Sequence, residues 1–282
     1  MQHGGSSLTA LGAAAHRAAH QILDMPRIFE DELALPILGK QGEAMLRERL
    51  DEPARLSGLR ALIAVRSRIA RDRLGAAIER GVSQYVVLGA GLDTSAYRDP
   101  ARRLRVFEVD HPATQSWKRA RLDAAGIAGA LMPSYVPVDF ERKSLRTALE
   151  EAGFSFGEPA FFAWLGVLPY LERRAIDETL HLIGKAPAEG MEIVFDYAEP
   201  PSTLSETRRS GFERMAQRVA AIGEPWRSFF AAAEMQAELE ASGFREIEDL
   251  DAKALTQRYC GSREDGLAVS PPARVVWARS GE

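Results

Sequence analysis

The sequence predicts an α/β protein with a doubly wound, mostly parallel β-sheet, and three observations support this prediction. Short apolar runs alternate with segments of helical periodicity along much of the chain. The run at 84–88 leads directly into Gly89-Ala90-Gly91, a turn that lets the backbone approach a ligand where a buried parallel strand ends. The next strand-like run ends in Asp110, 21 residues after Gly89. An acid at that spacing is typical of a carboxylate that binds the ribose of a nucleotide.

The glycine pattern also indicates which nucleotide would bind. A dinucleotide fingerprint reads Gly-x-Gly-x-x-Gly, whereas Thr94 occupies the third glycine position here. That glycine serves close packing around a pyrophosphate, so its absence disfavours a nicotinamide cofactor. S-adenosylmethionine presents adenosine without a diphosphate, which makes methyl transfer the leading hypothesis. A tight turn that binds nothing is the structural alternative.

Three motifs at these positions resemble the leucine carboxyl methyltransferase family. They are LGAGLDT at 88–94 followed by Tyr97-Arg98, EVDHP at 108–112 followed by Gln115, and VPVDF at 136–140. The nearest likeness is to the bacterial branch of small-molecule, polyketide-type O-methyltransferases, and it extends from about Thr9 to the last strand. The resemblance implies a seven-stranded class I methyltransferase fold, S-adenosyl-L-methionine as cofactor, a small-molecule acceptor and a place in secondary metabolism.

The resemblance also implies a set of cofactor-binding residues. Arg66 stands where the family binds the methionine carboxylate, and a planar guanidinium pairs well with a carboxylate; Arg68 is the fallback. Asp139 and Phe140 stand where the family holds the adenine, although an N-cap and a core residue would explain them equally. Many members carry an acid at the position of Leu165, so that role is absent here or filled elsewhere. The full predicted set is Arg66, Gly89, Ala90, Gly91, Asp93, Asp110, His111, Asp139, Phe140, Trp164 and Leu165.

Each secondary-structure element is predicted from a local pattern. Good helix formers at 8–23 and 43–50, and apolar residues spaced three to four apart at 59–80, predict three helices before the glycine turn. After the turn, strands are predicted at 104–110, 134–139, 160–165, 191–197, 244–250 and 273–278, the last antiparallel. Further helices are predicted at 112–126, 141–152, from 172 onward and at 229–242.

We expect these elements to form one domain over 1–282, because a chain of 282 residues with 46% hydrophobic content can build a single substantial core. Residues 1–80 would form a helical N-terminal extension and part of a lid, and 81–199 the cofactor-binding core. Residues 200–225 would form a lid insertion over the strand ends, with a plain surface insertion as the alternative. Residues 226–282 would complete the core.

The catalytic chemistry depends on the acceptor. Methyl transfer from a sulfonium is an in-line displacement that alignment and desolvation accelerate. A carboxylate acceptor, which we slightly favour, needs no base at neutral pH, whereas a hydroxyl acceptor needs one. The candidate bases by position are Tyr170, Asp196 and Tyr197, with His111 and His181 less favoured.

Composition excludes several other classes. The 36 basic residues against 40 acids give a net charge of −4, which leaves no basic surface for nucleic acid. The single Cys260 and the lack of zinc spacing predict no disulfide, no metal site and a cytoplasmic protein, and no run has the length of a membrane span. A nicotinamide-dependent oxidoreductase, which lacks support from any Tyr-x-x-x-Lys pair, and a non-catalytic S-adenosylmethionine-binding relative are the alternatives. Oligomeric state is left open.

Overall fold

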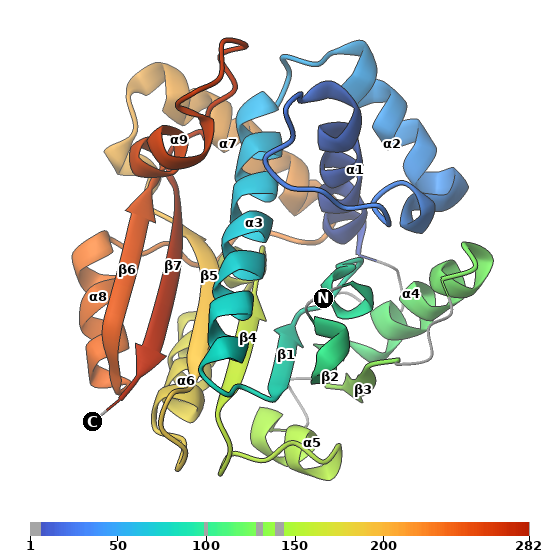
Figure 1. The fold of residues 1–282 in the computed structure, drawn as a ribbon. Coiled ribbons are helices and arrows are strands. Elements are labelled where there is room, and N and C mark those ends of the chain that lie inside the picture. The colour runs from blue at the N-terminus through green and yellow to red at the C-terminus, as the bar shows by residue number, and fades with distance from the viewer. Residues whose placement is uncertain (1–6, 99–100, 128–131, 139–143, 282) are drawn as a thin grey trace.

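The computed structural model describes residues 7–98, 101–127, 132–138 and 144–281. At its centre is a seven-stranded sheet in the order β3-β2-β1-β4-β5-β7-β6, in which β7 runs antiparallel to both of its neighbours, β5 and β6 (Figure 1). The predicted doubly wound sheet with an antiparallel last strand is therefore confirmed. The strands are β1 Gln84–Leu88, β2 Arg105–Asp110, β3 Ser134–Pro137, β4 Ala160–Trp164, β5 Glu192–Ala198, β6 Phe244–Asp251 and β7 Ala273–Ser280.

Helices cover both faces of this sheet. One face packs against α5, α6 and α8 around an apolar core that includes Phe162 and Phe195. The other face packs against α3, which lies over β4 and β5, and against α9, with α1, α2 and α4 beyond (Figure 1). The helices on the two faces are α5 Leu145–Glu151, α6 Arg173–Gly184 and α8 Ala232–Ala241, and α1 Leu8–Leu23, α2 Gly39–Asp51, α3 Ser57–Glu79, α4 Pro112–Ala124 and α9 Ala252–Cys260.

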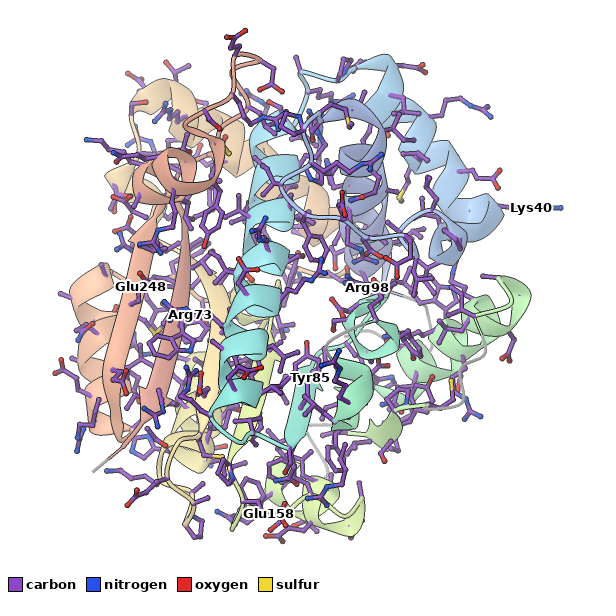
Figure 2. The ribbon with its side chains drawn as sticks, in the orientation of Figure 1. Lys40, Arg73, Tyr85, Arg98, Glu158 and Glu248 are labelled. Carbon is purple, nitrogen blue, oxygen red and sulfur yellow. The ribbon has the colours of Figure 1, made fainter. Side chains whose placement is uncertain are left out.

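Helix α3 is joined to the far edge of the sheet by a polar contact. Arg73 on α3 pairs with Glu248 on β6, and its guanidinium lies 4.0 Å from the ring centroid of Trp277 on β7 (Figure 2). Such stacking suits the planar arginine fork. Helix α3 thus joins the N-terminal extension to the part of the sheet formed by β4, β5, β7 and β6.

The N-terminal helix α1 forms where the sequence predicts it. The side chain of Ser7 accepts a hydrogen bond from the backbone N–H of Ala10, as an N-cap does. Alanine-rich faces then allow close packing, and α1 buries Leu11, Ala14 and Ala18 against its neighbours. This packing holds α1 beside α2 and α3 (Figure 1).

Two features of the structure go beyond the sequence prediction. The residues after β1 form only a short 3₁₀ turn, η2 (Ser95–Tyr97), where a doubly wound fold commonly places a long helix. Helix α9 was not predicted, although Asp251 caps it by accepting from the N–H of Ala254 at 2.7 Å. A nine-residue helix gives too short an apolar repeat to stand out in the sequence.

Candidate functional site

The glycine turn after β1 has the conformation that a ligand-binding turn requires. Gly89 and Gly91 have positive φ angles of +64° and +43°, which favour glycine. The backbone N–H of Gly89 donates to the carbonyl of Val109 at 2.8 Å, so the turn is held against β2. A Cβ added at Gly89 would lie 2.5 Å from Val167 Cγ2, and one at Gly91 would lie 3.1 Å from Ala10 Cβ. The turn is thus contacted from both α1 and the segment after β4.

Asp110 lies at the end of β2, next to this turn. Its two carboxylate oxygens accept hydrogen bonds from the backbone N–H groups of Gly91 and His111, both at 2.6 Å. Burial raises the pKa of the Asp110 carboxyl, although these two hydrogen bonds oppose the shift. The structure therefore brings Asp110 and Gly91 together as the spacing predicts. His111 itself caps α4, because its Nδ1 accepts from the N–H of Ala113 at 3.2 Å.

Arg66 and Asp196 meet at the carboxyl ends of β4 and β5. Arg66 Nη1, on α3, donates to Asp196 Oδ2 at 2.7 Å, and the backbone N–H of Gly166 donates to Asp196 Oδ1 at 2.6 Å. Both side chains are largely buried. Gly166 has a positive φ of +73°, and a Cβ there would lie 2.7 Å from Arg66 Nη2. The predicted carboxylate-binding arginine therefore lies beside one of the predicted base candidates.

The other two favoured base candidates, Tyr170 and Tyr197, lie in different parts of the structure. Tyr170, in the 3₁₀ turn η4 (Leu168–Tyr170), interacts with the side chains of Thr9 and Trp226, and burial raises the pKa of its hydroxyl. Arg66 also affects that pKa, so Tyr170 lies in the same neighbourhood. Tyr197 instead packs in the core under α8, and its hydroxyl donates to Asp249 at 2.7 Å.

Strand geometry explains this separation, since successive side chains point to opposite faces of a sheet. Asp196 faces α3 and Tyr197 faces the other side. His181, on α6, lies near Ser242 and is about half exposed, at 53%. The structure thus brings together Tyr170 and Asp196 and leaves Tyr197 and His181 apart from them.

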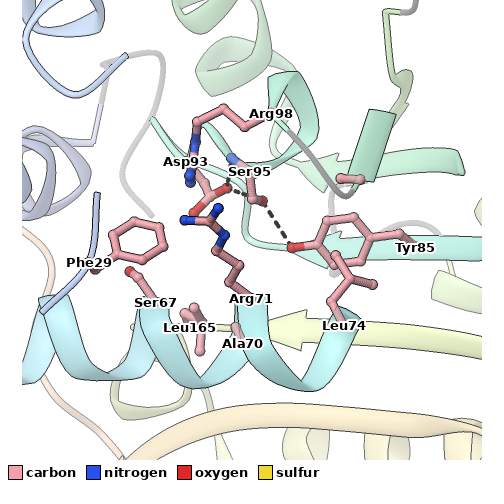
Figure 3. A pocket seen from close by; sticks show the side chains of 11 residues that line it. Phe29, Ser67, Ala70, Arg71, Leu74, Tyr85, Asp93, Ser95, Arg98 and Leu165 are labelled. Carbon is pink, nitrogen blue, oxygen red and sulfur yellow. Dashed lines mark hydrogen bonds between the residues drawn. The ribbon is translucent and has the colours of Figure 1, made fainter. Parts of the chain in front are cut away.

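A small cavity lies between α3 and the glycine turn (Figure 3). Asp93 reaches it with a carboxylate that accepts from the backbone N–H of Ser95 at 2.7 Å. Burial acts to raise the pKa of Asp93, but the charges of Arg17 and Lys118, together with the hydrogen bonds from Ser95, outweigh it and hold that pKa below its usual value. The cavity is lined by Phe29, Ser67, Ala70, Arg71, Leu74, Tyr85, Asp93, Ser95, Arg98, Ala101 and Leu165.

Four predicted cofactor residues lie on β4 or follow β3 and β4 along the chain. Leu165 contributes an apolar wall to the cavity at the position where many family members carry an acid. Trp164, its neighbour, points the other way into the core beneath α5 and α6. Asp139 and Phe140 lie outside the described residues. Ala90 is buried within the glycine turn.

Sequence reasoning missed a buried polar network that holds the turn. Arg17 on α1 donates from Nη2 to the carbonyl of Leu92 at 2.7 Å, and its Nε lies 2.7 Å from Asp31 Oδ2. The hydroxyl of Thr94 donates to the same oxygen at 2.7 Å, and Arg98 Nε lies 3.4 Å from Asp31 Oδ1. The residue that replaces the third glycine is therefore fully buried against the N-terminal extension. No local signal could reveal this contact, because Asp31 and Thr94 are 63 residues apart.

Two kinds of feature are absent from the part of the chain that the structure describes. Within it, no group of three or more His, Cys, Asp and Glu side chains is placed to hold a metal ion. None of its helices has both the length and the apolar character needed to cross a bilayer.

Comparisons with known proteins agree with this geometry. A family model described as leucine carboxyl methyltransferase matches residues 10–184. YktD of Bacillus subtilis (strain 168) is 32% identical over 302 residues, covering 99% of each chain. A Mycolicibacterium smegmatis (strain ATCC 700084 / mc(2)155) protein is 34% identical over 216 residues, covering 72% of this chain and 67% of its own. The names of both mark them as candidate S-adenosyl-L-methionine-dependent methyltransferases.

Similar solved structures support the fold alone, because their sequence identities to this chain are low. A DUF574 family protein from Streptomyces avermitilis has a TM-score of 0.51 at 17% identity, covering 95% of this chain and 97% of its own. The S-adenosylmethionine-dependent methyltransferase SibL has a TM-score of 0.50 at 13% identity, covering 96% and 70%. The chain therefore belongs to the leucine carboxyl methyltransferase family and is a methyltransferase that uses S-adenosylmethionine.

Proposed function

We propose that this methyltransferase acts on an oxygen of a small molecule, as the bacterial O-methyltransferase branch does, and that a carboxylate is preferred over a hydroxyl. The residues fit the cofactor chemically. Gly89 and Gly91 allow close approach, Asp110 offers carboxylate oxygens to ribose hydroxyls, and Arg66 offers a guanidinium to the methionine carboxylate. Bound there, S-adenosylmethionine supplies an electrophilic methyl group on a sulfonium.

The surroundings of the two nearby base candidates support the preference for a carboxylate. Both oxygens of Asp196 already accept a hydrogen bond, one from Arg66 and one from the N–H of Gly166, so this carboxylate holds Arg66 and the segment after β4 in place. Tyr170 is buried and its raised pKa keeps the hydroxyl protonated at neutral pH. An acceptor that is already ionised needs neither group. Its oxygen forms the new bond to the methyl carbon while the carbon–sulfur electron pair returns to sulfur, giving an ester and a thioether without proton transfer.

We also propose that the single domain closes over the acceptor with two lid segments, within 1–80 and 200–225. The backbone N–H of Thr9, in the first turn of α1, donates to Glu224 Oε2 at 3.0 Å, which joins the two segments directly. Helix α7 (Glu206–Ala221) buries none of its residues, as a helix that packs weakly on its neighbours would. Opening here would expose the ends of β4 and β5.

A cytoplasmic location is still a prediction, which rests on the single cysteine of the sequence.

The test of the acceptor oxygen uses methyl-labelled cofactor and a metabolite extract, with mass spectrometry to find the labelled product. We expect one labelled product that loses its label in alkali, because methyl esters hydrolyse and methyl ethers do not. Single-turnover rates should stay nearly flat above about pH 5, where a carboxylate is ionised. An alkali-stable product whose rate rises with pH would refute the carboxylate and indicate a hydroxyl acceptor. Cofactor binding without any labelled product would refute catalysis itself.

A further inference from the structure

Arg66 and Asp196 form an ion pair through a single hydrogen bond. Nη1 of Arg66 donates to Oδ2 of Asp196 at 2.7 Å, and the other two guanidinium nitrogens have no hydrogen-bond partner among the described residues. A guanidinium carries several more N–H donors than one such bond uses. Most of the donor capacity of Arg66 is therefore available to a ligand.

Asp196 also keeps part of its capacity to accept hydrogen bonds. Oδ1 accepts from the backbone N–H of Gly166 at 2.6 Å, and Oδ2 accepts from Arg66. An ionised carboxylate has about four lone-pair sites, so each oxygen can accept a further bond. The side chains of Arg66 and Asp196 are 11% and 7% exposed. The pair is thus largely withdrawn from water but is not sealed off from a ligand.

Gly166 determines how the guanidinium lies. A Cβ added at this glycine would lie 2.7, 2.9 and 3.1 Å from Nη2, Nη1 and Cζ of Arg66. Three such similar distances mean that the guanidinium presents its flat face to the backbone of Gly166. Its edge, which carries the N–H donors, is thereby left for Asp196 and for a ligand.

The Arg66–Asp196 pair lies on the opposite side of the glycine turn from Asp110. Strands β2, β1, β4 and β5 are consecutive in the sheet, and the turn follows β1, between Asp110 at the end of β2 and Asp196 on β5. Val167, next to Gly166, lies so close to the turn that a Cβ at Gly89 would be 2.5 Å from its Cγ2. A cofactor with its ribose at Asp110 would extend its methionine end past the turn toward the pair.

That end of the cofactor is a zwitterion, with a carboxylate and an ammonium group on one carbon atom. A lone guanidinium would match the carboxylate and leave the ammonium without an opposite charge, which is costly in a largely buried place. The Arg66–Asp196 pair presents both opposite charges side by side. A pair without net charge thus complements a ligand group without net charge.

We propose that the Arg66–Asp196 pair recognises the α-amino acid end of the cofactor, in which Arg66 binds the carboxylate and Asp196 binds the ammonium group. This inference rests on the proposed position of the cofactor and adds Asp196 as a binding residue. Both contacts are charge-assisted hydrogen bonds, which are stronger than neutral ones. Asp196 thereby has a function in cofactor recognition that requires no proton transfer.

Calorimetry with three ligands tests the proposal. S-adenosylhomocysteine carries both groups, its carboxypropyl analogue lacks the amino group, and its aminopropyl analogue lacks the carboxylate. We call the affinity for S-adenosylhomocysteine relative to the carboxypropyl analogue the amino preference, and relative to the aminopropyl analogue the carboxylate preference. In the wild type, both preferences should be at least about tenfold, as expected for charged hydrogen bonds.

Single substitutions assign the two preferences to the two residues. Asp196→Asn should reduce the amino preference to about threefold or less and keep the carboxylate preference, because the shape remains and the charge is lost. Arg66→Gln should do the reverse. Arg73→Gln is the matched control, since it removes another arginine of α3 that pairs with an acid of the sheet, Glu248. It should change neither preference.

The outcomes separate this proposal from the proposed function. A wild-type protein that does not bind S-adenosylhomocysteine would contradict the cofactor site itself. Binding of S-adenosylhomocysteine without an amino preference would overturn only the role of Asp196. An Asp196→Asn variant that keeps the amino preference would show that Asp196 merely positions Arg66, and it would overturn the proposal too.

A double variant keeps the test decisive if Asp196→Asn does not fold. Arg66→Gln combined with Asp196→Asn leaves no unpaired charge in this place, so the cost of a buried lone guanidinium is avoided. Both preferences should fall to about threefold or less in the double variant. An amino preference equal to that of the wild type would contradict the binding of the ammonium group by Asp196.

Discussion

The two faces of the sheet are built from different chemistry. The face under α5, α6 and α8 is packed with hydrocarbon and aromatic rings, such as the cluster of Phe154, Phe156 and Phe162 with ring centroids 4.7 and 5.7 Å apart. The face under α1, α3 and α4 buries ion pairs between its helices and loops. These pairs are Arg17–Asp31, Arg60–Asp24, Arg66–Asp196 and Lys118–Glu108.

The difference separates a face that supports the fold from a face that carries the candidate site. Buried charges cost desolvation energy, and an apolar replacement is often as stable, so ion pairs are weak evidence for stability alone. Here they connect segments that are distant in sequence to the glycine turn and to the ends of β4 and β5. We therefore expect damage to the charged face to affect cofactor binding, and damage to the apolar face to affect stability only.

The largest effect is expected at Gly91. Gly91→Val places a β-branched side chain at a positive φ and pushes against Ala10, so it should abolish binding of S-adenosylmethionine and S-adenosylhomocysteine alike. Isothermal titration calorimetry measures both. Gly75→Ala, in α3 with open space around the added methyl group, is the control and should bind normally. Retained binding in Gly91→Val would show that the turn is only structural.

A matched pair of core substitutions tests the comparison directly. Asp31→Ala leaves Arg17 and Arg98 without their buried partner and should cost about 3–5 kcal/mol of unfolding free energy. Phe162→Ala should cost a similar ~3–5 kcal/mol through the cavity it leaves. Urea unfolding measures both losses. Only Asp31→Ala should also weaken S-adenosylhomocysteine binding; equal affinities in the two variants would refute the division between the faces.

Asp110→Ala should weaken cofactor binding by about 2 kcal/mol, or roughly 30-fold in Kd, because charged hydrogen bonds to the ribose hydroxyls are lost. Calorimetry gives the affinity. Asp249→Ala is the control at the other edge of the sheet, where the carboxylate serves Tyr197 and Arg274. It should leave the affinity unchanged, and an unchanged affinity in Asp110→Ala would disprove the ribose assignment.

The smallest effect concerns pH. Burial raises the pKa of Glu108 to about 7, although Lys118, 2.8 Å away, opposes the shift. A carboxyl whose pKa is higher in the folded protein stabilises it below the unfolded pKa, and this stability is lost as pH rises through 7. Unfolding free energy should therefore fall by about 1 kcal/mol from pH 6 to 8. In Glu108→Gln, the midpoint of urea unfolding should change little between pH 6 and 8. If the midpoint of the variant falls with pH as steeply as that of the wild type, another group causes the effect.

Local patterns predicted most of the strands and helices within a few residues. The apolar runs at 85–88 in β1 and 193–195 in β5 are short and rich in β-branched residues, so the positions of these strands are evident without tertiary information. Helix ends depend on caps and on packing, which explains why the helix predicted at 43–50 extends to Gly39–Asp51. The helix predicted at 141–152 is described only from Leu145, where Ser144 caps it.

The glycine turn and Asp110 of the candidate site could be predicted from local sequence. Gly89, Gly91 and Asp110 belong to one strand–turn–strand unit, and their spacing follows from backbone geometry that neighbouring residues dictate. The arrangement of the arginines in the N-terminal extension could not be predicted in this way. Arg49 and Arg66 lie on separate helices, and their positions near His16 depend on how α1, α2 and α3 pack, which no spacing along the chain encodes.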